Sequence, residues 1–133
     1  MHLEIVSPKG LYAELEVESL SVKLTSGYRT ILGGHIPLIG ALDYAPMHIF
    51  SNGKIEYFAI HGGAINVTKD KVVLIVNAVE RAKDIDKSRA LLAKERAEKR
   101  LNSNDINIDV KRAKMALMRA LTRLDTLSLL EDK

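Results

Sequence analysis

The chain has no cysteine among its 133 residues, and only 5% of them are aromatic. Without cysteine there are no disulfides, no thiolate nucleophile and no Cys-based zinc site, which fits a reducing compartment. No apolar run approaches the roughly 18–20 residues of a membrane span, and the first residues have neither the basic nor the apolar segment of a signal peptide. The remaining composition, 47% hydrophobic and 28% charged, predicts one folded domain, or one domain with an appendage.

Glycine, proline and aromatic residues are missing from the later part of the chain. All eight glycines and all three prolines precede Ala64, and the last aromatic residue is Phe58. Charge divides near the same place, because residues 1–80 have six Lys/Arg and eight Asp/Glu, whereas residues 81–133 have fourteen and nine. The sequence therefore predicts two regimes, one rich in turn residues and one that is basic, free of breakers and rich in helix formers.

The turn-rich segment has the pattern of an antiparallel β-sandwich. Apolar residues alternate with polar ones over 11–17 and again, one residue out of phase, over 20–24, which predicts two strands separated by a bulge or break. The Asn-Gly pair at 52–53 lies between two apolar runs and predicts a hairpin with a type I′ turn. A second hairpin is expected around 68–71, and the His-Gly-Gly run at 61–63 is interpreted as a tight turn.

The breaker-free segment has the pattern of two helices. We expect Asp84 to cap the first helix, Asp86 to add negative charge to its first turn, and Asp109 to cap the second. A polar run at 102–105 predicts a short connection between them. Apolar positions recur at steps of three and four at Ala82, Ile85, Leu92, Ala93, Ala97 and Leu101, and at Val110, Ala113, Ala116, Leu117, Ala120, Leu121, Leu124 and Leu127.

These apolar stripes are narrow and rich in alanine, so two antiparallel helices can lie close together. Burying small side chains stabilises less than burying a Leu/Ile/Phe seam, at roughly 25 cal/mol per Å² of apolar area. We therefore expect the helical pair to be the less stable part of the molecule, able to undock or open. The predicted architecture is a segregated α+β fold, with an antiparallel β-sandwich over residues 1–83 and an antiparallel α-helical hairpin over residues 84–133.

The sequence contains no recognisable catalytic constellation. The histidines at 2, 35, 48 and 61 lack the i, i+4 spacing of a helical zinc pair, so no metal site is expected. The glycines at 33 and 34 are not followed by the Lys-Ser/Thr of a phosphate-binding P-loop, and no serine or threonine stands in a nucleophile-elbow pattern. We expect no catalytic residues and a chain that is not an enzyme.

Positive charge is concentrated in the helical segment. Between Lys87 and Arg123 there are eleven Lys/Arg and four acidic residues. Such a face suits nucleic acid, an anionic nucleotide or an acidic helix of a partner protein, but a solvated helix surface with pairs such as Glu95 and Lys99 explains it as well. Nucleic acid is the weaker alternative, because no aromatic residue interleaves with the basic ones to stack on bases.

Three stretches carry a resemblance to a known family. They read SVKLTSG at 21–27 followed by ILGGHIPL at 31–38, YFAIHGGAINV at 57–67, and AVERAKDID at 78–86. In this order, before two helices, they resemble the epsilon subunit of bacterial F-type ATP synthases over essentially the whole chain. Thr30 stands where the family has a glycine, Gly33 where it has a proline, and Ala64 where it often has an aromatic residue. These departures affect the expected loop conformation and leave the expected fold unchanged.

The resemblance implies a non-catalytic subunit at the foot of the rotating central stalk, which helps couple ion flow to rotation. Its partners would be the gamma subunit, the c-ring and the alpha/beta head, on the cytoplasmic face of the cell membrane and without a membrane span of its own. A sandwich loop around Tyr28 and Arg29 would contact the c-ring, and His35 would lie near gamma. Extended helices would inhibit ATP hydrolysis and folded helices would release it, with contacts to an acidic part of beta from Lys111, Arg112 and Lys114.

Some members of that family bind ATP as a regulatory ligand. The resemblance therefore implies no required cofactor for this chain, with ATP as a regulatory ligand. The resemblance places their ATP contacts at Ile85, Asp86, Arg89 and Ala90, which complete an I/L-D-x-x-R-A motif, and at Glu80, Arg119 and Arg123. The arginines can meet a triphosphate, and the carboxylates can accept hydrogen bonds from the adenine amine or ribose. ATP would then favour the folded hairpin through its differential affinity. Alternatively, Asp86 neutralises the first helical turn and Arg89 forms a salt bridge.

Two further functions stay open at the level of sequence. One is a stand-alone module whose basic hairpin binds nucleic acid, which a steep salt dependence of DNA binding would reveal. The other is an accessory subunit of a specialised F-like motor outside the usual synthase. The resemblance favours a subunit of the central stalk, and we expect no nucleic-acid partner.

Overall fold

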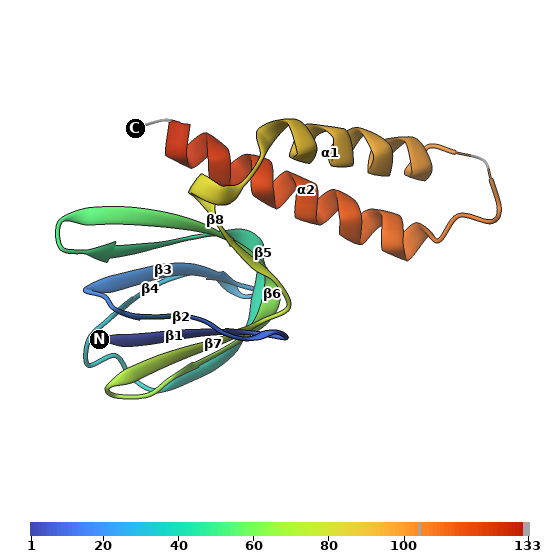
Figure 1. The fold of residues 1–133 in the computed structure, drawn as a ribbon. Helices are drawn as coiled ribbons and strands as arrows, with labels where there is room; N and C mark the ends of the chain where they lie inside the picture. The colour runs from blue at the N-terminus through green and yellow to red at the C-terminus, as the bar shows by residue number, and fades with distance from the viewer. Residues whose placement is uncertain (104, 132–133) are drawn as a thin grey trace.

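The computed structural model describes residues 1–103 and 105–131. A β-sandwich is followed by two antiparallel helices that pack against each other (Figure 1), which confirms the predicted fold. The strands are β1 His2–Ser7, β2 Gly10–Glu16, β3 Ser19–Leu24, β4 Gly27–Leu32, β5 Leu38–Ser51, β6 Lys54–Val67, β7 Lys71–Val76 and β8 Val79–Arg81, and the helices are the 3-10 turn η1 Ala82–Asp84, α1 Lys87–Leu101 and α2 Val110–Glu131.

The strands form one hydrogen-bonded sheet that curves back on itself. Its order is β2-β1-β7-β6-β5-β3-β4, and β8 pairs with β6 beside β7. The two longest strands, β5 and β6, bend as they cross the molecule (Figure 1), so the sheet encloses a core. Apolar side chains from both sides of the fold fill it, the largest fully buried ones including Phe58, Leu3, Ile5, Leu20 and Ile31.

Both predicted hairpins are confirmed. Asn52 and Gly53 have φ angles of 53° and 75°, as a type I′ turn requires, and they join β5 to β6. The second hairpin joins β6 to β7, with Val67 opposite Val72. The expected break in the first alternating pattern separates β2 from β3.

The predicted tight turn at 61–63 is wrong, because β6 runs through these residues without a break. Gly62 and Gly63 have φ angles of 75° and 138°, which bend the strand and do not end it. Before the bend, Ile60 pairs with β8, and after it Gly63 pairs with β7. The glycine pair therefore lets one strand present the same edge to two successive partners.

The first helix begins later than predicted. Asp84 ends the 3-10 turn η1, and Ile85 is extended with φ −82° and ψ 126°, so a helix cannot start at Asp84. Asp86 is the N-cap instead, and its carboxylate accepts a hydrogen bond of 3.1 Å from the backbone N–H of Arg89. Asp109 caps α2 as predicted, accepting from the backbone N–H of Arg112 at 3.0 Å.

The boundaries around the helices also bear on what the sequence predicts. The predicted division of the chain at residues 83 and 84 falls inside η1 and stays a prediction. Residues 102, 103 and 105 of the predicted polar connection lie between the two helices, while Asn104 lies outside the described residues. Within the described part of the chain, neither long helix has the apolar length that crossing a membrane requires.

Alanines form the seam between the two helices, as their spacing predicted. Ala90 and Ala97 of α1 are buried, as are Ala113 and Ala120 of α2. Several larger members of the predicted stripes point to solvent instead, namely Leu92, Val110 and Leu121. Helices that approach closely leave room only for small side chains between them, which explains why the real seam is narrower than the predicted stripes.

The contact between the helices and the sandwich is small and partly polar. It is made mainly by α2, which packs on β5 and β6, and among the described residues its buried apolar cluster consists of Ala59, Ile85 and Leu127. Thr122 and Thr126 are also buried, and their hydroxyls donate to carbonyls of their own helix, Met118 and Thr122. A buried apolar cluster of this size contributes little to the free energy of docking.

We predict that backbone amides of residues 90–120 exchange with deuterium faster than the core amides of β5 and β6. The reason is that the helices can leave the sandwich without unfolding it. Residue-resolved hydrogen exchange measures this directly. Equal protection of helices and strands would rule out an independently opening hairpin.

We predict that Gly63→Ala destabilises the protein by about 2 kcal/mol or more. An added Cβ would lie 2.2 Å from the carbonyl oxygen of Ile75, on a backbone with φ of 138°. Denaturant unfolding gives the free energy. Gly33→Ala is the matched control, because its Cβ would meet nothing within 4 Å and its φ is not in the left-handed region, so an equal loss in both variants would contradict the prediction.

Candidate functional site

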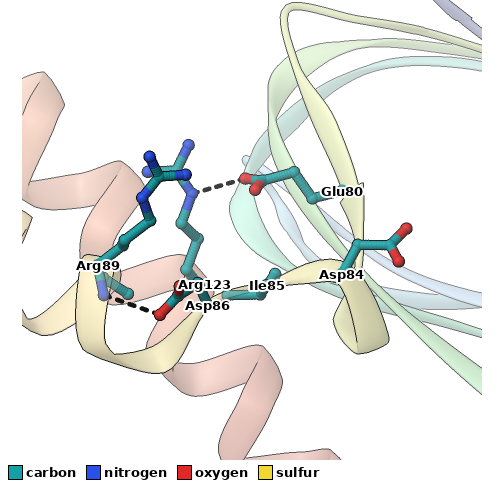
Figure 2. A pocket seen from close by; sticks show the side chains of 7 residues that line it. Glu80, Asp84, Ile85, Asp86, Arg89 and Arg123 are labelled. Carbon is teal, nitrogen blue, oxygen red and sulfur yellow. Dashed lines mark hydrogen bonds and ion pairs between the residues drawn. The ribbon is translucent and has the colours of Figure 1, made fainter.

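A polar pocket of about 230 Å³ lies where the sandwich, the linker and the helices meet (Figure 2). It brings together all but one of the residues predicted to bind ATP, the exception being Arg119, and it adds Asp84. Its lining residues are Glu80, Asp84, Ile85, Asp86, Arg89, Ala90 and Arg123. The residues come from β8, from η1 and the linker, from the first turn of α1, and from α2.

Local structure explains how each wall of the pocket is placed. Glu80 stands on the short strand β8, opposite Ala59 of β6. Ile85 is buried between Ala59 and Leu127, which anchors the linker under α2. Asp86 caps α1 and fixes where Arg89 emerges. The pocket is therefore complete only while α2, which supplies Arg123, is docked on the sandwich.

Glu80 is the electrostatic centre of the pocket. Its Oε1 accepts a hydrogen bond of 2.6 Å from Nε of Arg123 and lies 3.1 Å from Nε2 of His61. The hydrogen bond with His61, followed by the hydrogen bond and charge of Arg123, holds the pKa of Glu80 below its usual range. The carboxylate is thus ionised near neutral pH, and among the described residues its Oε2 has no hydrogen-bond partner.

His61 is the residue that sequence reasoning missed. It is buried with 1% exposure, and its ring meets Tyr44 edge to face at a centroid distance of 6.0 Å. A histidine between Ile60 and a glycine pair, within an apolar strand, was the available signal. Its partner Glu80 lies on another strand, and only the strand register reveals that the two side chains meet.

Arg89 supplies uncommitted positive charge. Among the described residues its guanidinium has no acidic partner, whereas that of Arg123 is paired with Glu80. Both guanidinium groups stand at the same end of the pocket (Figure 2). Arginine donors beside free carboxylate oxygens can bind a ligand that combines an anionic group with amine or hydroxyl donors. The pocket lining has no hydroxyl, thiol or amine nucleophile, so this arrangement suits binding.

Arg119 lies one helical turn before Arg123 on α2, outside the pocket. It lines a neighbouring hollow together with Asp109, Lys111, Arg112 and Met115. Residues four apart share a helix face, so Arg119 extends the row of positive charge beyond the pocket mouth.

The remaining predicted contact residues stand on two distant surfaces. Lys111, Arg112 and Lys114 are exposed near the start of α2, the end farther from the sandwich (Figure 1). Tyr28 and Arg29 are exposed on β4. His35 is half-buried in the following loop, with its Nδ1 2.6 Å from the carbonyl oxygen of Ile36. Exposed apolar side chains surround this loop, namely Leu32, Ile36 and Ile39.

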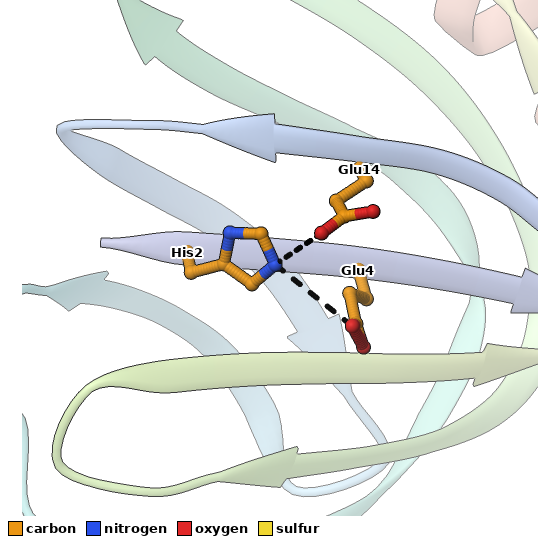
Figure 3. Close-up of side chains that lie close together, drawn as sticks. All are labelled: His2, Glu4 and Glu14. Carbon is orange, nitrogen blue, oxygen red and sulfur yellow. Dashed lines mark ion pairs between the residues drawn. The ribbon is translucent and has the colours of Figure 1, made fainter.

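A group of metal-ligand residue types lies on the sandwich, although the sequence predicted no metal site. Nε2 of His2 lies 2.9 Å from Glu14 and 3.8 Å from Glu4 (Figure 3). Nδ1 of His2 lies 2.9 Å from Glu16. Lys71 pairs with Glu4 at 3.0 Å. The hydrogen bond with Glu16 raises the pKa of His2 despite some desolvation. These pairings explain the group as an ion-pair network across β2, β1 and β7.

Comparison with protein families gives two matches that divide the chain. A model described as the beta-sandwich domain of the ATP synthase delta/epsilon chain matches residues 1–82. A model described as the long alpha-helix domain of the same chain matches residues 83–128.

Curated relatives match over nearly the full length. The ATP synthase epsilon chain of Bacillus cytotoxicus is 44% identical over 123 residues, which cover 92% of each chain. The ATP synthase epsilon chain of Staphylococcus aureus is 41% identical over 125 residues, which cover 93% of each chain.

Solved structures share the fold. A chain of the Euglena gracilis mitochondrial ATP synthase, in a structure of OSCP, F1 and c-ring, aligns with a TM-score of 0.80 at 19% identity, covering 96% of this chain and 79% of that one. A chain of the Tetrahymena thermophila mitochondrial ATP synthase, from its central stalk and c-ring, aligns with a TM-score of 0.57 and 19% identity, covering 99% and 94%. With family models matching almost its whole length and relatives above 40% identity, the chain belongs to the ATP synthase delta/epsilon family.

Proposed function

We propose that this chain couples the gamma subunit to the c-ring and regulates ATP hydrolysis through its C-terminal helices, with ATP as the ligand that favours the folded hairpin. As a member of its family it is a non-catalytic subunit of the central stalk of a rotary ATP synthase. The observation that carries the regulatory part is the convergence of β8, the linker and α2 on one polar pocket. We place the chain at the cytoplasmic face of the cell membrane, as a peripheral part of the complex.

The surface formed by β4, the loop that follows it and the start of β5 is suited to binding partner subunits. Tyr28, Ile36 and Ile39 are 69%, 79% and 81% exposed, and Leu32 is 57% exposed. Large apolar side chains that are this exposed favour a protein partner over water. We assign the c-ring contact to Tyr28 and Arg29 and the gamma contact to His35.

The start of α2 is suited to a different partner. Lys111, Arg112 and Lys114 are exposed there and carry three positive charges over little more than one turn. An acidic surface of beta would pair with them when the helices extend along the stalk, since opposite charges steer and hold such contacts. Undocking of α2 therefore exchanges the contact with the sandwich for one with the alpha/beta head.

ATP fits the chemistry of the pocket. The volume of about 230 Å³ is below the ~300–1,000 Å³ of pockets that enclose a whole ligand, so the phosphates would lie outside it, along the arginines. Arg89, Arg123 and, beyond the mouth, Arg119 supply guanidinium donors in that direction. The carboxylates of Glu80, Asp84 or Asp86 can accept from the adenine amine or ribose.

Binding of ATP would stabilise the docked hairpin. Its contact residues come from elements that adjoin only when α2 lies on the sandwich, so the ligand has differential affinity for that state. No covalent step is involved, which agrees with the absence of a nucleophile in the pocket lining.

We predict that a tagged chain retrieves alpha, beta, gamma and c together from nuclease-treated cell membranes, with the retained proteins identified by mass spectrometry. Alpha, beta and gamma without c would indicate a specialised motor. Retrieval of none of these subunits would contradict the assignment to the central stalk.

We predict that Arg123→Ala and Arg119→Ala each weaken ATP binding tenfold or more, which corresponds to about 1.4 kcal/mol. Arg123 loses a donor inside the pocket, and Arg119 loses one along the expected path of the phosphates. Isothermal titration calorimetry of the isolated chain measures the affinity. Arg96→Ala, an exposed arginine of α1, is the control for loss of charge. Unchanged affinity of Arg119→Ala would remove that residue from the site.

A further inference from the structure

One oxygen of Glu80 serves two partners that belong to different modules. Oε1 contacts His61, which stands on β6 inside the sandwich, and Arg123, which stands on α2. The two distances are 3.1 Å and 2.6 Å. When α2 leaves the sandwich, Arg123 leaves with it, whereas His61 stays.

His61 is held rigidly enough to orient its partner. Its side chain is 1% exposed, and the ring packs edge to face on Tyr44 of β5. The backbone on both sides is also fixed, because the N–H of His61 donates to the carbonyl of Ala78 at 3.0 Å and Gly62 follows with a left-handed φ. Glu80, in contrast, stands at the pocket wall, and its side chain is 30% exposed.

The hydrogen on the ring can be assigned from the partner. An ionised carboxylate only accepts hydrogen bonds, so we assign the hydrogen to Nε2 of His61, which donates to Oε1 of Glu80. Nδ1 of His61 is buried and has no partner among the described residues. Among the described residues, Glu80 is therefore the hydrogen-bond partner of the His61 ring.

We propose that His61 is a positioning residue of the nucleotide site, which holds Glu80 in its docked orientation whether or not α2 is present. By engaging Oε1, it keeps Oε2 free to accept from a donor on the ligand. It also keeps Oε1 where Arg123 meets it when the helices fold back. This role rests on the proposed ATP site and explains why a histidine is buried beside the bend of β6.

The test compares the wild-type chain with His61→Ala and His61→Gln. Gln retains a side-chain N–H in place of Nε2, whereas Ala removes it. Calorimetry with ATP is expected to show about five- to tenfold weaker binding for His61→Ala, the effect of one hydrogen bond to a charged group, and recovery to within about twofold for His61→Gln. Equal loss in both variants, with cooperative unfolding intact, would overturn the proposal.

A spectroscopic measurement separates positioning from a general structural effect. NMR titration of the Glu80 side-chain carboxyl should give a higher pKa in His61→Ala than in the wild type, because the largest contribution that lowers this pKa is removed, and a lowered pKa again in His61→Gln. An unchanged pKa in His61→Ala would overturn the proposal. This result does not depend on ATP, so it stands even if the wild-type chain fails to bind the nucleotide.

A double-mutant cycle tests whether His61 acts through Glu80. Glu80→Ala and His61→Ala are combined, and ATP affinity is measured for both single variants and the double variant. If His61 works by orienting Glu80, the second substitution adds little to the first. Additive losses would contradict this, because they would mean that His61 affects ATP by another route. If the wild-type chain itself binds no ATP, the proposed function fails in that respect, and the Glu80 titration alone decides the role of His61.

Discussion

Among the described residues, one ion pair, Glu80 with Arg123, connects the sandwich with α2. The bond of 2.6 Å lies beside a cluster of only three apolar residues, Ala59, Ile85 and Leu127. Ion pairs that remain partly exposed contribute about 0–1 kcal/mol each, so docking of α2 is expected to be weak. A weak contact is what a regulatory element needs, since a ligand or a partner subunit can then change its population.

Under the proposed function, the same feature would link ligand binding to the conformation of the chain. The pocket lies between the two modules, and its lining residues come from β8, the linker, α1 and α2. The sandwich contributes an oriented carboxylate, and the helices contribute most of the positive charge. A partner that captures the basic start of α2 would compete with the pocket, because one helix carries both surfaces.

Features with local causes were predictable from the sequence, and those set by strand register were not. The Asn52-Gly53 turn, the Asp109 cap and the alanine seam follow from residues close in the chain. A glycine pair occurs both in tight turns and in bent strands, so the sequence does not distinguish the two. The bend at Gly62 and Gly63 was therefore predicted as a turn. Most of the residues that line the pocket were expected because the resemblance to a family with a contiguous I/L-D-x-x-R-A motif implied them. His61 was missed because its partner stands nineteen residues away on another strand.

We expect ATP to close the hairpin onto the sandwich, and hydrogen exchange of α2 with and without ATP measures this closure. If undocking exposes these amides, saturating ATP should slow their exchange by a factor that grows with ATP concentration over Kd, about 100-fold at 100 times Kd. Core amides of β5 and β6 should keep their rates. Identical α2 exchange at saturating ATP would contradict the account, since a ligand bound across the junction must oppose its opening.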